Sequence, residues 1–156
     1  MVFGHDGEVR EWISAELGYR VAADYAIGIV QGDLLIAGIG YGGWKVRPDG
    51  SHYACEMSIA STTPSWCSRR HLQILFGIPF LQWEIERIQA SLSRANKSAR
   101  KFVDRVGFKY EGTGRKGWPD GGDVVVYSML QSDCRWLKGV THEPERRQFD
   151  AGTRAA

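Results

Sequence analysis

A capped amphipathic helix close to position 100 constrains the fold of this chain more than any other feature of its sequence. Four apolar side chains from Ala99 to Val106 recur at i, i+3, i+4 and i+7, so they share one face of a helix. Asn96 precedes this stretch in the position of an N-cap, and Gly107 follows it in the position of a C-cap. Residues 108–112 then have the composition of a strand. The segment therefore predicts a helix that leads directly into a strand.

The rest of the chain alternates short strands with helices. Hydrophobic periodicity and turn residues predict two further helices, over 6–18 and 66–77, and strands over 25–30, 34–41, 52–61, 85–92 and 123–130. The glycines at positions 38, 40, 42 and 43 are expected to loosen the end of the second strand. This order of elements indicates an α+β fold with a mixed sheet.

Composition narrows the class of protein. The chain has 156 residues, 43% of them hydrophobic, and a formal net charge of +2, as expected for one folded domain. Three cysteines without CxxC spacing favour a reduced compartment. The first residues lack the pattern of a signal peptide, and no apolar stretch approaches 18 residues, so a cytoplasmic protein without a membrane span is expected. Residues 94–117 hold eight basic side chains against two acidic ones and could face an anion.

The segment Asn96–Gly112 also carries a signature. It begins with an asparagine, continues to Val-Gly-Phe and ends with Glu-Gly. This arrangement resembles the signature of the GNAT N-acetyltransferase superfamily, in which an asparagine is followed by [LV]-G-F and then by E-G. The resemblance is closest to the branch that includes the ribosomal-protein N-terminal acetyltransferases and to small relatives common in phage and prophage genomes. It implies an acetyltransferase domain over residues 1–137, with a C-terminal tail over 138–156.

The resemblance implies a GNAT fold, with a mostly antiparallel sheet of about six strands and helices on both of its faces. Two strands, expected at 52–61 and 85–92, would splay apart and bind the pantetheine arm of acetyl-CoA, with Ile59 and Ser61 pairing to it. Unpaired amides on strand edges and the N-terminus of the next helix suit such a ligand. Acetyl-CoA is therefore the expected acetyl donor.

The expected phosphate loop departs from the family pattern. The family carries glycines in this loop, but residues 64–71 contain none. Side-chain contacts from Ser68, Arg69 and Arg70 could replace backbone contacts, since guanidinium groups match phosphate geometry. The alternative for these arginines is a solvated start of a helix. The residues expected at the cofactor are Ile59, Ser61, Ser68, Arg69, Arg70, Asn96 and Arg100.

Glu56 is the candidate general base, because it shares a strand face with small residues near the expected cleft. A structural hydrogen bond or ion pair is the alternative. The general acid is less defined, since the tyrosine that many family members carry seven residues after the asparagine is Val103 here. Tyr127 is the candidate proton donor, with Ser98 and Tyr110 as further options. Direct transfer is preferred over a covalent acetyl-enzyme, because no His/Asn/Asp arrangement supports a cysteine nucleophile.

The amine acceptor is expected to meet aromatic side chains at Tyr41 and Trp44, in the glycine-rich stretch, and at Trp118, in the last turn. A peptide N-terminus, a small amine and an amino group on a modified base all remain open, as does a homodimer. The histidine spacing predicts no metal site. The alternative function is a catalytically degenerate GNAT-fold module that binds nucleic acid or a protein partner, with nucleic acid not favoured.

Overall fold

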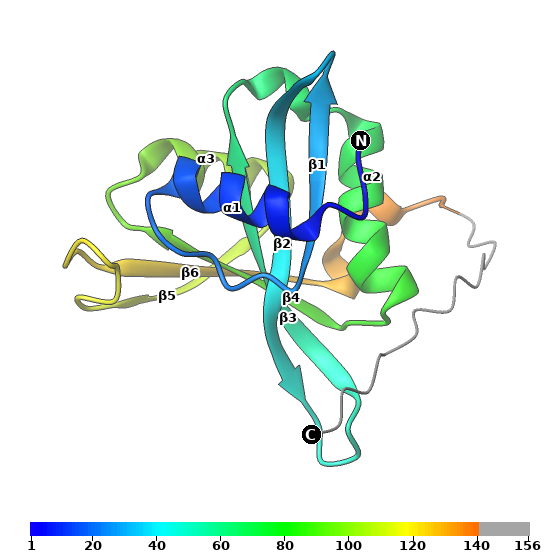
Figure 1. The fold of residues 1–156 in the computed structure, drawn as a ribbon. Coiled ribbons are helices and arrows are strands. Elements are labelled where there is room, and N and C mark those ends of the chain that lie inside the picture. Colours follow the sequence, from blue (N-terminus) through cyan, green and yellow to red (C-terminus); the bar gives the residue numbers. More distant parts are fainter. Residues whose placement is uncertain (141–156) are drawn as a thin grey trace, which may run out of the picture.

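The computed structural model describes residues 1–140, in which six strands form one sheet with helices on both faces (Figure 1). The strand order is β1-β2-β3-β4-β6-β5, and β3–β4 is the one parallel pair in the described part of the chain. The elements are α1 (Asp6–Leu17), β1 (Tyr25–Gln31), β2 (Leu34–Val46), β3 (His52–Ser61), α2 (Arg69–Gly77), β4 (Arg87–Ser93), α3 (Lys97–Val106), β5 (Lys109–Gly114) and β6 (Val124–Leu130). The predicted α+β class with a mixed, mostly antiparallel sheet is confirmed.

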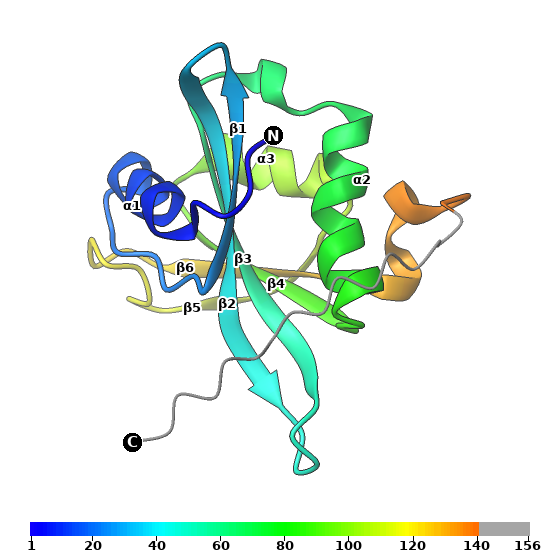
Figure 2. The same cartoon turned by 45° about the vertical axis from the view of Figure 1, so that its right-hand side comes forward.

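Helix α1 packs against β1, β2 and β3 on one face of the sheet (Figure 2). The close approach depends on glycines that alternate along β2. A Cβ on Gly38 would lie 2.6 Å from Ile13 of α1, and a Cβ on Gly42 would collide with the carbonyl of Ala22. The expected loosening is present only near the end of the strand, where Gly43 has a φ of 59° and the ladder to β3 shifts register between Gly42 and Lys45. β2 continues to Val46, and its glycines make room for the helix and for the segment that follows it.

Helices α2 and α3 cover the opposite face and close the main hydrophobic core (Figure 2). Phe76 of α2 packs against Phe108, with ring centroids 6.0 Å apart. Val103 and Val106 of α3 are buried in the same core. The predicted caps of α3 are confirmed: the Asn96 carboxamide accepts from the Ala99 N–H at 3.0 Å, and Gly107 adopts a φ of 114°.

β3 and β4 separate after a short parallel ladder. Only three residue pairs join them within residues 1–140, and Glu56 with Gln89 is the last of these pairs. Beyond it β3 runs on to Ser61 and β4 to Ser93, while β4 stays paired to β6. The splay expected between these two strands is present, and it leaves the facing edges of both strands unpaired.

The segment between β3 and β4 differs from the expected single helix over 66–77. A short 3-10 turn occupies Pro64–Trp66, and α2 begins only at Arg69, after its N-cap Ser68. At its other end α2 continues into a π-helical turn over Ile78–Gln82, which contains Pro79. The expected tail over 138–156 lies almost wholly outside the described residues.

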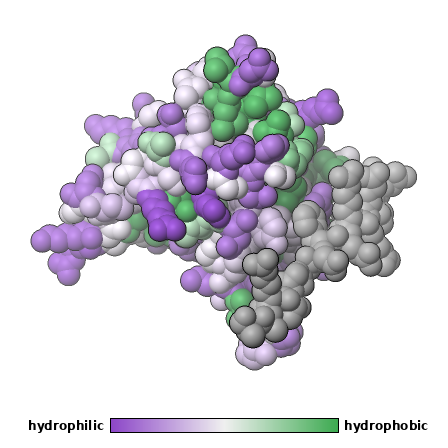
Figure 3. Space-filling view, viewed as in Figure 1, coloured by the Kyte–Doolittle hydropathy of each residue, from purple (hydrophilic) through white to green (hydrophobic). Residues whose placement is uncertain are grey.

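The surface in the view of Figure 3 is mostly hydrophilic, with hydrophobic residues gathered over the upper parts of β1, β2 and α2. Leu34, at the turn between β1 and β2, is 73% exposed, and Phe3 is 57% exposed. Within residues 1–140, the helices are all too short or too polar to cross a lipid bilayer.

Candidate functional site

A cleft of about 830 Å³ opens where β3 and β4 diverge. The diverging halves of the two strands, residues 57–61 and 90–93, form its sides, and residues of α3 and of the segment before α2 complete it. Because neither strand pairs with the other beyond Glu56, backbone N–H and C=O groups face the cleft from both sides. The cleft is therefore suited to an extended ligand that carries amide groups.

The segment that precedes α2 has few free amides for an anion. The N–H of Cys67 donates to the Pro64 carbonyl at 3.2 Å, and the N–H of Ser68 donates to the Trp66 carbonyl at 3.0 Å. Trp66 itself is buried against Phe102 of α3. These internal bonds occupy the groups that a glycine-rich loop would offer to a phosphate.

Two arginines gather where α2 begins. The N–H groups of Arg69 and Arg70 have no acceptor inside the helix because they belong to its first turn, and the Ser68 hydroxyl accepts from the His71 N–H at 3.1 Å. The Arg69 side chain lines the cleft, and so does Arg105 of α3. Burial raises the pKa of the Cys67 thiol, and the Arg105 guanidinium nearby opposes that rise. This end of the cleft is therefore positively charged.

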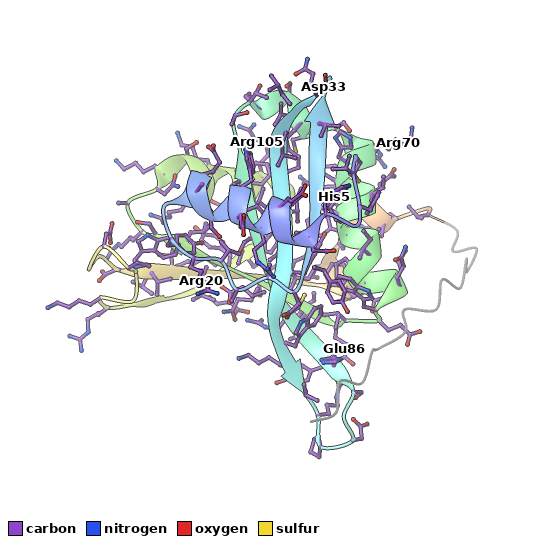
Figure 4. All side chains as sticks on the ribbon, in the orientation of Figure 1. His5, Arg20, Asp33, Arg70, Glu86 and Arg105 are labelled. Carbon is purple, nitrogen blue, oxygen red and sulfur yellow. The ribbon has the colours of Figure 1, made fainter. Side chains whose placement is uncertain are left out.

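The cleft contains four of the seven residues expected at a cofactor: Ile59, Ser61, Arg69 and Asn96. Ser68 instead caps α2. Arg70 is exposed, lies outside the cleft lining and extends from the outer side of α2 (Figure 4). Sequence reasoning missed Arg105, although its position in the basic segment 94–117 was a signal that could have identified it.

Arg100 and Tyr127 bond to each other away from the cleft. Arg100 Nε donates to the Tyr127 hydroxyl at 3.3 Å, and Arg100 Nη1 donates to the carbonyl of Arg94 at 3.4 Å. Tyr127 is 2% exposed, and its ring packs against Tyr110 with centroids 5.7 Å apart. Neither side chain lines the cleft. The two residues join α3 to the sheet in this structure, and their expected roles, Arg100 at the cofactor and Tyr127 as proton donor, stay predictions.

Glu56 lies at the point where the two strands separate, on the sheet face that α1 covers in part. It lines a second cavity of about 230 Å³, together with Lys45 of β2 and with Arg87 and Gln89 of β4. Within residues 1–140 its carboxylate forms no ion pair or side-chain hydrogen bond. The alternative of a structural ion pair therefore finds no partner in the described part of the chain.

Tyr19 lines the large cleft and lies close enough to Glu56 to feel its charge, and sequence reasoning missed it. Its half-buried side chain lines the large cleft. Burial raises the pKa of its phenol, and the nearby Glu56 carboxylate raises it further. The Tyr19 ring meets the ring of Trp118 edge to face, with centroids 5.1 Å apart. Trp118 lines the cleft as well, so this expected acceptor contact lies at the site.

Tyr41 and Trp44 do not lie at the cleft, and both belong to β2 rather than to a loop. Tyr41 is fully buried and donates its hydroxyl to the Leu75 carbonyl at 2.8 Å. Trp44 donates its indole N–H to Asp24 at 2.6 Å and packs against Trp83. The expected placement of these two side chains in a loop is therefore wrong, and their contact with an acceptor stays a prediction.

The thiols and the titratable side chains of the described residues give the site no nucleophile or metal cluster. Burial raises the pKa of the Cys55 thiol to about 12, which keeps it protonated and unreactive at neutral pH. Burial also raises the pKa of Cys134. Among residues 1–140, no three His, Cys, Asp or Glu side chains come together as metal ligands.

Arg87 is fixed by a bidentate ion pair beside the smaller cavity. Its two terminal nitrogens donate to Glu111 of β5 at 2.6 and 2.5 Å, and the Ser128 hydroxyl donates to the same carboxylate at 2.5 Å. These bonds lower the pKa of Glu111 to about 2. Arg87 therefore pairs with Glu111, and among residues 1–140 Lys45 is the unpaired cation that lines the smaller cavity.

The arrangement of strands and cleft is that of the GNAT acetyltransferase fold. No protein-family profile and no curated protein sequence matches this chain. Solved structures do match: the ribosomal-protein-S5-alanine acetyltransferase of Vibrio fischeri is similar over 71% of this chain and 63% of its own, with 18% identity and a TM-score of 0.60.

Two further neighbours have the same fold. RimJ of Mycobacterium smegmatis, solved in complex with CoA-disulfide, covers 73% of this chain with 15% identity and a TM-score of 0.58. A chimera of the spermidine N-acetyltransferase SpeG from Vibrio cholerae and hSSAT covers 72% of this chain with 17% identity and a TM-score of 0.58. This chain matches only 58% of the length of RimJ and 69% of the length of the chimera. At these identities the comparisons establish the fold, and the expected relation to phage proteins stays a prediction.

Proposed function

We propose that this protein is an N-acetyltransferase that uses acetyl-CoA to acetylate an amine directly. The observation that carries the proposal is the 830 Å³ cleft between β3 and β4, whose unpaired strand edges lead to a positively charged helix start. The GNAT neighbours support it, since one of them is bound to a CoA derivative.

The residues present fit acetyl-CoA. The edge of β3 from Met57 to Ser61 offers backbone groups to the two amides of a pantetheine arm. Arg69 and Arg105 offer guanidinium groups to phosphates at the far end of the cleft, which compensates for the amides that the glycine-free segment uses internally. When bound, acetyl-CoA supplies an activated acetyl group as a thioester.

Glu56 is the proposed general base. It occupies the last paired position before the strands separate, so its carboxylate lies beside the narrow end of the cleft. Transfer forms one C–N bond and breaks one C–S bond, and the acceptor ammonium loses two protons. One proton ends on the thiol sulfur, and Glu56 passes the other to water.

Tyr19 is the described phenol that both lines the cleft and lies near Glu56. Its raised pKa keeps the hydroxyl protonated at neutral pH, which suits a hydrogen-bond donor to the reacting groups. We assign Tyr19 in place of Tyr127 as the residue that supplies this hydrogen bond.

Calorimetric titration with acetyl-CoA and with CoA tests the proposal without knowledge of the acceptor. Micromolar binding of both is the expected result. Glu56→Gln should retain that binding and lose about 10²-fold or more in acetyl transfer, within the usual range of general base catalysis. Glu11→Gln, an exposed carboxylate on α1 outside both cavities, is the matched control.

The same titration distinguishes an acetyltransferase from the alternative, a catalytically degenerate module that only binds a partner. Absence of binding up to millimolar acetyl-CoA would favour it, together with nucleic-acid binding that weakens steeply with salt. The fold already uses part of the basic segment, because Arg94 pairs with Asp123 and Lys109 pairs with Asp133. This internal pairing reduces the charge available for a nucleic-acid surface.

A further inference from the structure

We propose that the acceptor is a small amine that also carries a carboxylate, such as a free amino acid, and that the 230 Å³ cavity beside Glu56 holds it. This inference rests on the proposed acetyltransferase function and specifies its acceptor. The cavity follows the large cleft along β3 and β4, because residues 53–56, 87 and 89 line the one and residues 57–61 and 90–93 the other.

The cavity contains one unpaired charge of each sign. Glu56 supplies a carboxylate and Lys45 an ammonium group, and neither pairs with the other or with another side chain within residues 1–140. A zwitterion satisfies both groups at once, with its amine toward Glu56 and its carboxylate toward Lys45. A charge-assisted hydrogen bond of this kind is stronger than a neutral one.

The positions of the two residues fix the direction of the ligand. Glu56 pairs across the sheet with Gly42, and Lys45 pairs with Ala54, two residues farther from the splay. The amine end of the ligand therefore lies beside the splay, where the acetyl group would be, and the carboxylate end lies farther down the sheet. Gln89 completes the polar lining, with its side-chain carbonyl accepting from Arg87 Nη2 at 3.4 Å.

The cations of this cavity disfavour other acceptors. A polyamine such as spermidine would place additional positive charge near Lys45, which like-charge repulsion opposes. A neutral base amine would leave the charge on Lys45 without a partner. The carboxylate of the acceptor thus determines specificity, and Lys45 is the residue that binds it.

The test compares twenty free L-amino acids, the methyl esters of those that react, and spermidine, each with acetyl-CoA and with detection of the released thiol. We expect at least one amino acid to be acetylated with a kcat/KM about tenfold or more above that of its methyl ester and above that of spermidine. Lys45→Met should raise the KM for the amino acid about tenfold and leave the ester unchanged. Lys138→Met, an exposed lysine outside both cavities, should change neither.

Binding of the amino acids, measured by calorimetry without the donor, separates the two proposals. If acetyl-CoA binds but esters or spermidine react as well as amino acids, the carboxylate inference is wrong and the acetyltransferase proposal stands. If acetyl-CoA fails to bind while an amino acid binds in a way that Lys45→Met weakens, the acetyltransferase proposal is wrong and the cavity assignment stands. If acetyl-CoA binds and all twenty amino acids neither bind nor react, the carboxylate inference is overturned.

Discussion

The ring of Tyr19 meets the ring of Trp118 edge to face, with centroids 5.1 Å apart and planes at 77°. Tyr19 follows α1, and Trp118 lies in the turn between β5 and β6, so the contact joins two segments about a hundred residues apart in sequence. Both side chains line the cleft. The contact therefore forms part of the wall of the cleft.

Trp118→Ala should weaken acceptor use and leave donor binding intact. An aromatic pair contributes about 0.5–1.5 kcal/mol beyond the area it buries, which corresponds to a change of roughly tenfold at most. We expect the acceptor KM to rise by about that factor in steady-state kinetics, with the affinity for acetyl-CoA unchanged by calorimetry. Phe3→Ala, an exposed ring away from the cleft, is the control. Equal loss of donor affinity in Trp118→Ala would place this ring at the cofactor instead.

Arg69→Ala and Arg105→Ala should each weaken acetyl-CoA binding. Both guanidinium groups line the end of the cleft where the backbone amides are already bonded, so the proposed site depends on them for its phosphate contacts. A hydrogen bond to a charged group contributes about 1.5–3 kcal/mol, so a loss of about tenfold or more in affinity is expected for each variant.

Arg70→Ala is the matched comparison for those two variants, because Arg70 is the neighbour of Arg69 but lies outside the cleft. Its affinity for acetyl-CoA should equal that of the unaltered protein. The affinity of the unaltered protein should also fall as salt rises, and Arg69→Ala should reduce that dependence. A loss in Arg70→Ala equal to that in Arg69→Ala would contradict the assignment.

Local sequence patterns predicted the elements of the fold because each depends on neighbours in the chain. The caps of α3 are examples, since Asn96 bonds to Ala99 and Gly107 adopts the left-handed conformation that ends a helix. The same patterns missed the packing role of Gly42, because this glycine is needed for contact with Ala22, twenty residues earlier. Glycines at every second position of a strand lie on one face of the sheet. Such a pattern can indicate that another segment packs closely against that face, as well as a loose strand.

The candidate site was predicted in part for the same reason. Ile59 and Ser61, which the resemblance to the GNAT superfamily implied on the diverging strands, lie at the cleft. Tyr127 and Tyr19 do not follow from local sequence. Which phenol faces the cleft depends on how Arg100 reaches across to β6 and on where the chain passes after α1.

Gly42→Ala should destabilise the protein because a methyl group at this position would collide with the backbone carbonyl of Ala22. Overpacking of this kind costs about 1–3 kcal/mol of unfolding free energy, which denaturant titration can measure. Gly112→Ala is the control: it lies in β5, and no atom comes within 4 Å of the position of its added methyl group. Equal stability of the two variants would show that the chain after α1 moves to accept the methyl group.

Glu111→Gln should reduce the dependence of stability on acid pH. Hydrogen bonds from Arg87 and Ser128 lower the pKa of Glu111 from its ordinary 4.5 to about 2 in the folded protein. A carboxylate with a lowered folded-state pKa stabilises the protein fully above its unfolded value, and this stabilisation is lost as the pH falls from about 4.5 to 2. Because the Arg87–Glu111 pair is partly exposed, we expect Glu111→Gln to lower the free energy of unfolding by roughly 1 kcal/mol at pH 7. We also expect the free energy of unfolding of this variant to depend less steeply on pH between 4.5 and 2.

Glu86→Gln, which breaks the more exposed pair with Arg47, should change the unfolding free energy by a few tenths of a kcal/mol at most. Denaturant titrations of both variants across this pH range provide the comparison, and identical slopes would show that Glu111 is not the group that titrates.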